Sequence, residues 1–191
     1  FLAGWQSDQA LTPSADRKWD TADNFKHTRG SIVFARNAAY DIADDMGLEY
    51  FIQLDDDYTE FWYRNTDDMM FTGKPIKNLD AVFSYMLDFY INTPSVMTIA
   101  MAQGGDMIGG KDNKYNREIT LHRKAMNTFI CSTKRRIRFI GRINEDVSAY
   151  TLYGRQGLIF FTQFVTMITQ MQTQANAGGM TDLYKANGTY I

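Results

Sequence analysis

From residue 31 onward, apolar runs typical of buried strands alternate with apolar stripes at helical spacing. The runs predict strands at residues 49–54, 96–101, 125–131 and 158–165. The stripes predict helices at residues 32–46 and 79–90, and a third helix that begins near residue 144 and continues toward residue 157. A helix that feeds a strand through a tight glycine turn is typical of a wound sheet with helices packed on it. The pattern therefore predicts an α/β fold.

Capping residues support the first two helices. Ser31 is a suitable N-cap and Gly47 a suitable C-cap for the first, and Asn78 is a suitable N-cap for the second. We expect the first helix to turn one apolar stripe inward, made of Ala35, Ala39, Ile42 and Met46. The aromatic segment from Tyr58 to Phe71 predicts a hairpin, either as a lid over a site or as a small sheet with its own core.

The composition limits the class of protein. The chain has 191 residues, 45% of them hydrophobic and 22% charged, which suits one globular domain over residues 1–191. A net charge of −2 argues against a generally basic nucleic-acid coat, while a local basic patch stays open. The single cysteine, Cys131, excludes an internal disulfide and suits a reducing compartment such as the cytoplasm. No apolar run reaches the roughly 18 residues of a membrane span, so no membrane association is expected.

Both ends of the chain differ from its middle. Residues 1–30 are polar and predict an irregular segment, and the Gln-, Ala- and Gly-rich residues 170–179 predict a flexible tail. The chain begins with Phe1 rather than Met and ends on Ile191 after an Ala-Asn-Gly-Thr turn. We interpret both ends as cut from a longer protein.

The predicted strand at residues 49–54 leads into three consecutive carboxylates, Asp55, Asp56 and Asp57. In an open α/β sheet, ligands bind at the carboxyl ends of the strands. Adjacent carboxylates repel one another unless a cation neutralises them, and oxygen ligands at this density suit Mg²⁺ or Mn²⁺ rather than Zn²⁺. The alternative is a solvated acidic turn, the ordinary explanation for an arbitrary Asp triplet.

Glu145 and Asp146 form a second acidic pair, at a predicted loop-to-helix junction. Asn144 or Asp146 could cap the helix that follows, and capping alone would explain these residues. The alternative is that one of the two acids is a general base facing a bound substrate.

A glycine-rich loop and a basic cluster are weaker signals. Gly104 and Gly105 follow the predicted strand at 96–101 and allow the backbone to approach a ligand, although their spacing is not that of a phosphate loop. The notable cationic cluster includes Arg123, Lys134, Arg135 and Arg136. This cluster is either a solvated face or a contact to a phosphate backbone.

The order of these motifs carries a resemblance to a known family. Arg36 and Asn37 lie on a predicted helix about 18 residues before the Asp-x-Asp, and a glycine-rich loop and the Glu-Asp pair follow. This set resembles the nucleotide-sugar glycosyltransferases of the GT-A fold, over roughly residues 29–165. It is most similar to the TET-associated glycosyltransferase family of bacteriophages, whose members are thought to glycosylate hydroxymethylated pyrimidines in DNA, such as hydroxymethylcytosine.

The resemblance implies a GT-A-like, Rossmann-like fold with a mixed, mostly parallel sheet flanked by helices. It implies that Asp55 and Asp57 hold Mn²⁺ or Mg²⁺ against the diphosphate of the donor, expected to be a uridine diphosphate hexose or pentose. Asp56 and the glycines at 104 and 105 would lie close to the donor. Arg36 would add a fixed positive charge there, and Asn37 amide hydrogen bonds.

The resemblance further implies that Asp146, beside Glu145, deprotonates the acceptor hydroxyl in a single inverting displacement. For a DNA acceptor, Trp62 would stack on a flipped base while Arg123, Lys134, Arg135 and Arg136 contact the backbone. Such an enzyme would act in the cytoplasm of a phage-infected bacterium. Many relatives complete the metal site with a His that follows the Glu-Asp helix, whereas the histidines of this chain are His27 and His122.

Three other functions stay open from the sequence. The Asp cluster would serve a phosphoryl or nucleotidyl transferase with two metal ions if a further acid came close to it. A GT-A-like module without activity would bind only a partner or DNA. A glycosyltransferase that acts on protein or glycan would keep the same site without a basic groove.

Overall fold

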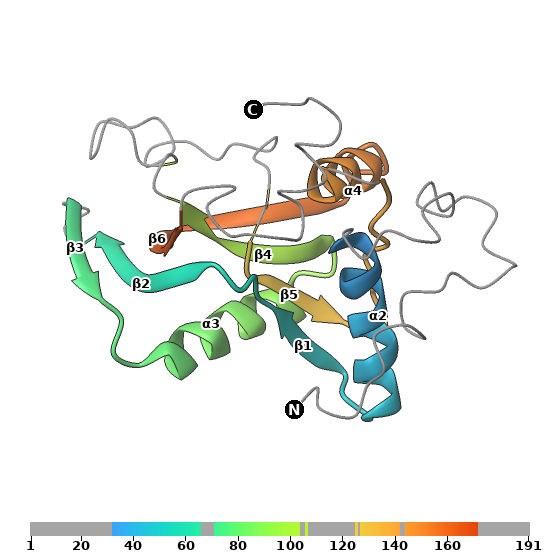
Figure 1. The fold of residues 1–191 in the computed structure, drawn as a ribbon, viewed down its shortest axis with the longest axis horizontal. Helices are drawn as coiled ribbons and strands as arrows, with labels where there is room; N and C mark the ends of the chain where they lie inside the picture. The colour runs from blue at the N-terminus through green and yellow to red at the C-terminus, as the bar shows by residue number, and fades with distance from the viewer. Residues whose placement is uncertain are drawn as a thin grey trace, which may run out of the picture.

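The computed structural model describes residues 32–65, 71–103, 106, 125, 127–141 and 144–171. Their elements, drawn in Figure 1, are α2 (Ile32–Asp45), β1 (Tyr50–Gln53), β2 (Tyr58–Asn65), β3 (Phe71–Pro75), α3 (Leu79–Asn92), β4 (Val96–Gln103), β5 (Phe129–Ser132), α4 (Glu145–Gly154) and β6 (Ile159–Gln170). Several parts of the predictions lie outside the described residues. They are the irregular segment at 1–30, the glycines at 104 and 105, and residues 172–179 of the tail.

The strands form a middle layer with helices on both faces (Figure 1). On one face, α2 and α4 contribute Tyr40 and Ala149 to a buried cluster with β4, β5 and β6. On the other face, α3 contributes Met86 and Tyr90 to a second cluster. This layering confirms the predicted α/β class with flanking helices. None of the described helices is both long enough and apolar enough to cross a membrane.

The strands belong to two sheets, not to one mostly parallel sheet. β1 and β5 pair antiparallel, and the other sheet has the order β3-β2-β6-β4. Within the described residues only β4 and β6 pair in parallel, so the expectation of a mostly parallel sheet is wrong for this part of the chain. β2 and β3 are joined directly as the predicted hairpin, and such short links give antiparallel pairs.

β6 lies between β4 and β2. It runs parallel to β4 and antiparallel to β2, and it ends at Gln170 rather than at residue 165 as predicted. A register shift in the β4 pairing, between Met101 and Ala102, leaves part of β6 outside that ladder. The irregular pairing explains why a simple apolar run underestimates the length of the strand.

α3 and β4 follow the sequence closely. The Asn78 side chain accepts a hydrogen bond of 3.1 Å from the N–H three residues later, which confirms the predicted N-cap. Every residue of β4 from Val96 to Ala102 is buried. A strand that is covered on both faces is expected to be apolar along its whole length, as this one nearly is.

α2 buries a different stripe from the one predicted. Val33, Arg36, Tyr40 and Ala43 are buried, whereas Met46 is 59% exposed. The apolar count missed this face because one of its members is an arginine. A charged side chain on the inward face of a helix needs partners, and these define the candidate site.

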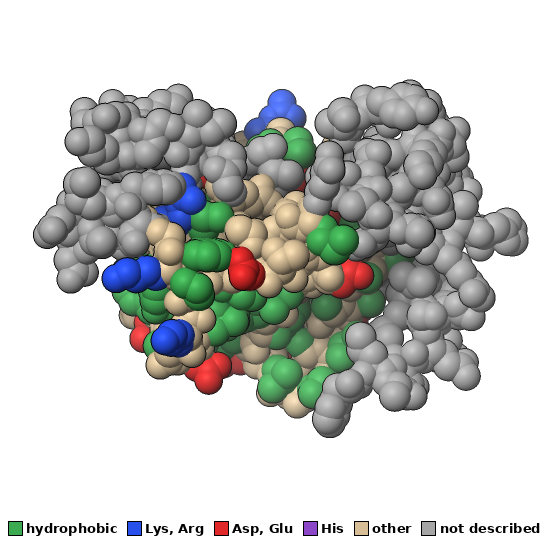
Figure 2. Space-filling view, turned by 60° about the vertical axis from the view of Figure 1, so that its left-hand side comes forward, with side chains coloured by type: hydrophobic (Ala, Val, Ile, Leu, Met, Phe, Trp, Pro, Cys, Tyr) green, Lys and Arg blue, Asp and Glu red, His purple; other side chains and the backbone are tan. Residues whose placement is uncertain are grey.

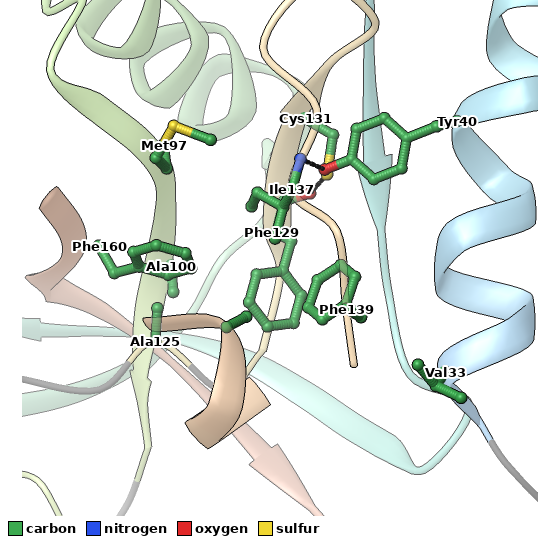
Figure 3. Close-up of a cluster of buried hydrophobic side chains, with 11 residues drawn as sticks. Val33, Tyr40, Met97, Ala100, Ala125, Phe129, Cys131, Ile137, Phe139 and Phe160 are labelled. Carbon is green, nitrogen blue, oxygen red and sulfur yellow. Dashed lines mark hydrogen bonds between the residues drawn. The ribbon is translucent and has the colours of Figure 1, made fainter. Parts of the chain in front are cut away.

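Phe129 and Phe139 are two buried rings of the cluster to which α2 and α4 contribute. Their rings meet edge to face, with centroids 5.4 Å apart, and they lie together in Figure 3. In the same view, the Tyr40 hydroxyl accepts a hydrogen bond of 3.1 Å from the backbone N–H of Ile137. Burial raises the pKa of the Cys131 thiol to about 12, so this cysteine is an apolar core residue.

β5 begins at Phe129 instead of residue 125. Thr128 has a φ of +46°, a left-handed backbone that no strand contains. This residue therefore separates the strand from the buried residues that precede it.

Candidate functional site

Arg36 is the central residue of the candidate site. Its side chain points inward from α2 and is 6% exposed. Nη2 donates a hydrogen bond of 3.0 Å to Oδ1 of Asp55, and Nε donates one of 3.0 Å to Oε1 of Glu145. One guanidinium thus joins α2, the turn after β1 and the first turn of α4. It brings together the two acidic groups that lie far apart in the sequence.

The local structure fixes each part of this bridge. The guanidinium carbon of Arg36 lies 4.8 Å from the ring centroid of Phe129 and 5.5 Å from that of Phe139, within the range of cation–π contacts. Gln53, the last residue of β1, donates a hydrogen bond of 3.1 Å to the backbone carbonyl of Arg36. Glu145 is the first residue of α4, where the helix dipole favours a negative charge.

The charges of the bridge act on one another through a largely buried environment. Burial raises the pKa of Asp55 and of Glu145, and the positive charge of Arg36 opposes this rise at both carboxyls. Burial lowers the pKa of Arg36, but the two carboxylates outweigh it and the net shift is upward. Arg36 therefore stays charged and holds the two acids as its counter-ions.

Asp57 has a free acceptor. Its Oδ1 is buried and has no hydrogen-bond partner among the residues that the structure describes. Burial raises the pKa of Asp57, and the charge of Asp56 adds to the rise. A buried carboxylate oxygen without a donor is an expected position for a cation.

Asp55 and Asp57 offer a small set of oxygens to a metal ion. Oδ1 of Asp55 is occupied by Arg36, while its Oδ2 has a contact of 3.5 Å to the hydroxyl of Tyr58. In the described part of the chain, no group of three or more His, Cys, Asp or Glu side chains is arranged to hold a metal. Mg²⁺-type sites use one or two carboxylates, with water and substrate phosphates completing the shell. Oδ2 of Asp55 and Oδ1 of Asp57 are the oxygens of this pair that Arg36 leaves available to such an ion.

The sequence reasoning missed the residues that support Asp55. The Tyr58 hydroxyl, which contacts Asp55, accepts a hydrogen bond of 3.1 Å from the backbone N–H of Thr128. Tyr58 directly follows the acidic triplet, and Gln53, which binds the Arg36 carbonyl, lies two residues before it. The available signal was a polar residue at the end of an apolar strand.

Neither capping explanation accounts for the acidic pair on α4. Asn144 holds the N-cap position with a φ of +55°, and its side chain makes no capping hydrogen bond. Asp146 lies within the helix and is 9% exposed, next to Glu145. Glu145 is explained by its bond to Arg36 rather than by capping.

Asn37 and Asp56 differ in their surroundings. The Asn37 amide donates to the carbonyl oxygen of Phe139 and accepts from its N–H, both at 2.9 Å. Asn37 thus fixes the backbone of Phe139, whose ring lies against Arg36. The expected partner of Asn37 was instead the nucleotide-sugar. Asp56 is exposed.

The basic residues near β5 have partners within the chain. Lys134 pairs with Glu49 at 3.0 Å, and Arg136 pairs with Asp41 and Asp44 at 2.7 and 2.9 Å. Glu49 directly precedes β1, and Asp41 and Asp44 lie on α2, whereas Asp55 follows the opposite end of β1.

Arg135 stabilises the end of α3. Its guanidinium donates to the carbonyl oxygens of Tyr90, Thr93 and Pro94 and lies 4.0 Å from the Tyr90 ring centroid. Figure 2 shows the described Lys and Arg side chains on the drawn face as separate spots among apolar and neutral atoms.

The remaining predicted residues are not part of the bridge. Trp62 donates from Nε1 to Glu60 at 2.9 Å and packs against the buried pair Ala102 and Met167. Gly104, Gly105 and Arg123 lie outside the described residues.

The chain was compared with known families and proteins. A family model described as TET-Associated Glycosyltransferase matches residues 21–179, well over half of the chain, and this range includes every residue of the bridge. Neither the curated proteins nor the solved structures contain a match.

Proposed function

Because the chain belongs to the TET-associated glycosyltransferase family, we propose that it transfers a sugar from a nucleotide-sugar donor to a hydroxymethylated pyrimidine in DNA. The family accounts for the class of reaction. The Arg36 bridge is the structural observation that carries the proposal, because it links Asp55, after β1, to Glu145 at the start of α4. Sugar transfer needs a donor site and a proton acceptor held in a fixed relation, and this link supports such an arrangement.

On the donor side, we assign Asp55 and Asp57 to a Mn²⁺ or Mg²⁺ ion. The free Oδ1 of Asp57 supports this assignment. A bound ion offsets the negative charge that develops on the departing diphosphate. The exposed Asp56 and the glycines at 104 and 105 are assigned to the surroundings of the donor, with a uridine diphosphate sugar as the expected molecule.

Arg36 has a positioning role in this proposal. At 6% exposure, and with both acids on its guanidinium, it orients Asp55 and Glu145 and balances their charge. The positive charge of Arg36 acts to lower the pKa of both acids and so opposes the rise that burial causes. Asn37 assists by holding the backbone at Phe139.

On the acceptor side, Asp146 takes the proton of the attacking hydroxyl. The hydroxyl oxygen forms a bond to the anomeric carbon, the bond from that carbon to the diphosphate breaks, and the configuration is inverted. Glu145 is engaged by Arg36 and is therefore assigned to the orientation of the first turn of α4. Asp146 lies beside Glu145 in the same first turn, so the bond from Glu145 to Arg36 also holds the helix end that carries Asp146.

We propose the DNA acceptor on the resemblance to this family, and such an acceptor would be met in the cytoplasm of a phage-infected bacterium. Lys134, Arg135 and Arg136 remain candidates for the backbone contact and Trp62 for stacking, although all four have partners within the chain. Transfer to hydroxymethylated DNA, unmodified DNA and a glycan should therefore be compared directly. A mass increase of one sugar on the hydroxymethylated DNA alone is the expected result.

Donor binding is the first test of the site. Uridine, guanosine and cytidine diphosphate sugars are titrated into the protein by calorimetry, with and without Mn²⁺. The same titrations are made with Asp57→Asn, which keeps the shape of the side chain and removes its charge. Asp45→Asn is the matched control, because Asp45 is an exposed acid at the end of α2.

We expect Mn²⁺-dependent binding of one donor, lost in Asp57→Asn and kept in Asp45→Asn. Binding that Asp57→Asn leaves intact would contradict the assigned metal site. A protein that binds no donor under any condition would contradict the proposed enzyme and favour a module without activity.

A further inference from the structure

We propose that Tyr58 is a positioning residue for Asp55, and that the left-handed backbone at Thr128 holds Tyr58 in place. This inference rests on the proposed function, since it concerns how an acid of the donor site is presented. The site described so far is built from α2, β1 and α4. Tyr58 adds a residue from β2, and Thr128 connects that residue to β4.

The first step is the orientation of the Asp55 carboxylate. Arg36 holds Oδ1 at 3.0 Å, and the Tyr58 hydroxyl approaches Oδ2 at 3.5 Å. Two contacts on different oxygens restrict rotation of the carboxylate, which one contact alone would allow. The contact at 3.5 Å is long for a hydrogen bond, so Tyr58 guides Oδ2 without competing strongly for it.

The second step is the direction of the Tyr58 hydroxyl hydrogen. The backbone N–H of Thr128 donates to the hydroxyl oxygen at 3.1 Å. A hydroxyl that accepts a hydrogen bond on its lone pair still has its own hydrogen to donate. The acceptor next to it is Oδ2 of Asp55, so the N–H of Thr128 directs the hydroxyl toward the carboxylate.

The third step is the rigidity of Thr128. A β-branched residue rarely adopts a φ of +46°, and this one is fully buried. Its Oγ1 accepts from the N–H of Met101 at 2.9 Å and donates to Oδ1 of Asn127 at 2.6 Å. Asn127 in turn donates to the carbonyl oxygen of Met101 at 3.1 Å. These bonds fasten the strained residue to β4.

Strain of this kind persists where the surrounding structure imposes it, and here the imposed conformation aims one N–H at Tyr58. The route β4, Thr128, Tyr58, Asp55 thus links the packed middle layer to an acid of the site. Such support from neighbouring hydrogen bonds presets the geometry of residues that contact a ligand.

The test compares Tyr58→Phe with Tyr63→Phe. Both tyrosines are half-buried on β2, and the Tyr63 hydroxyl makes no hydrogen bond within the described part of the chain. Mn²⁺ affinity is measured for the wild type and both variants by electron paramagnetic resonance, beside the thermal midpoint. Turnover of the donor then separates KM from kcat.

Tyr58→Phe should weaken Mn²⁺ binding about tenfold or more and raise the KM for the donor, as expected when a supporting hydrogen bond to a ligand is lost. Tyr63→Phe should bind Mn²⁺ like the wild type. Equal Mn²⁺ affinity in the wild type and Tyr58→Phe would overturn the inference while leaving the proposed function intact. A wild-type protein that binds neither Mn²⁺ nor Mg²⁺ would overturn both.

Discussion

Replacing Arg36 with methionine tests the central link of the site. Methionine keeps much of the side-chain volume above Phe129 but provides neither a charge nor a hydrogen-bond donor. Asp55 and Glu145, whose side chains are 25% and 8% exposed, would then face the same buried space without their shared cation. Breaking a buried ion pair by removing one partner lowers the free energy of unfolding by about 3–5 kcal/mol. We expect a loss in that range near neutral pH.

The loss should depend on pH in a defined direction. Burial already raises the pKa of both carboxyls in the folded protein, and Arg36 restrains the rise. A carboxyl whose pKa is higher in the folded than in the unfolded state stabilises the fold at low pH, and this contribution is lost as pH rises through the folded pKa. Removing Arg36 raises both folded pKa values further. The difference between variant and wild type should therefore be larger at pH 7.5 than at pH 5.

Urea denaturation followed by circular dichroism at both pH values measures these differences. Arg136→Met is the matched control, because Arg136 also pairs with two carboxylates but is 41% exposed. Exposed pairs contribute about 0–1 kcal/mol, so the control should stay close to the wild type. If Arg36→Met also stays within about 1 kcal/mol of the wild type at pH 7.5, or if its loss is the same at both pH values, the argued role of the bridge is wrong.

Three further variants follow from the described contacts, each measured by denaturation. Asp57→Asn should be at least as stable as the wild type above pH 6, because it removes a charge whose Oδ1 has no donor; a clear loss of stability would contradict this. Asn37→Ala removes two hydrogen bonds to the backbone of Phe139 and should lower the free energy of unfolding by about 1–3 kcal/mol. An unchanged midpoint would show that these bonds contribute little. Arg135→Ala removes the bonds to the end of α3 and should lower the free energy of unfolding by a similar amount. Its affinity for the nucleotide-sugar should equal that of the wild type.

The sequence predicted most elements because their apolar patterns agree with their burial. β4 is a continuous apolar run and is buried almost throughout, and the Asn78 cap of α3 was visible as a residue type in the expected place. The prediction failed on α2, where Arg36 occupies an inward position and the buried stripe does not include the predicted Ala35 and Ala39. A pattern of apolar residues does not register an inward charge whose partners lie 19 and 109 positions away.

The sequence also predicted only part of the candidate site. The two acidic groups were visible as clusters at the ends of predicted elements, and the structure joins Asp55 and Glu145 through Arg36. Tyr58 and Thr128 were not predicted, because their roles depend on a left-handed backbone and on a contact across 70 residues. The basic residues at 134–136 look alike in the sequence, and only the structure shows their separate partners.

The position of β6 has a consequence for synthesis on the ribosome. β6 is the last described strand in the chain, yet it lies between β2 and β4, which otherwise share no pairing. The four-stranded sheet therefore cannot close until residue 170 has left the exit tunnel, well after the earlier strands have emerged. During that interval the hairpin of β2 and β3 and the apolar strand β4 have unpaired edges, and chaperones recognise such surfaces on nascent chains. Slowing translation before β6 should prolong this interval and increase aggregation of the nascent chain.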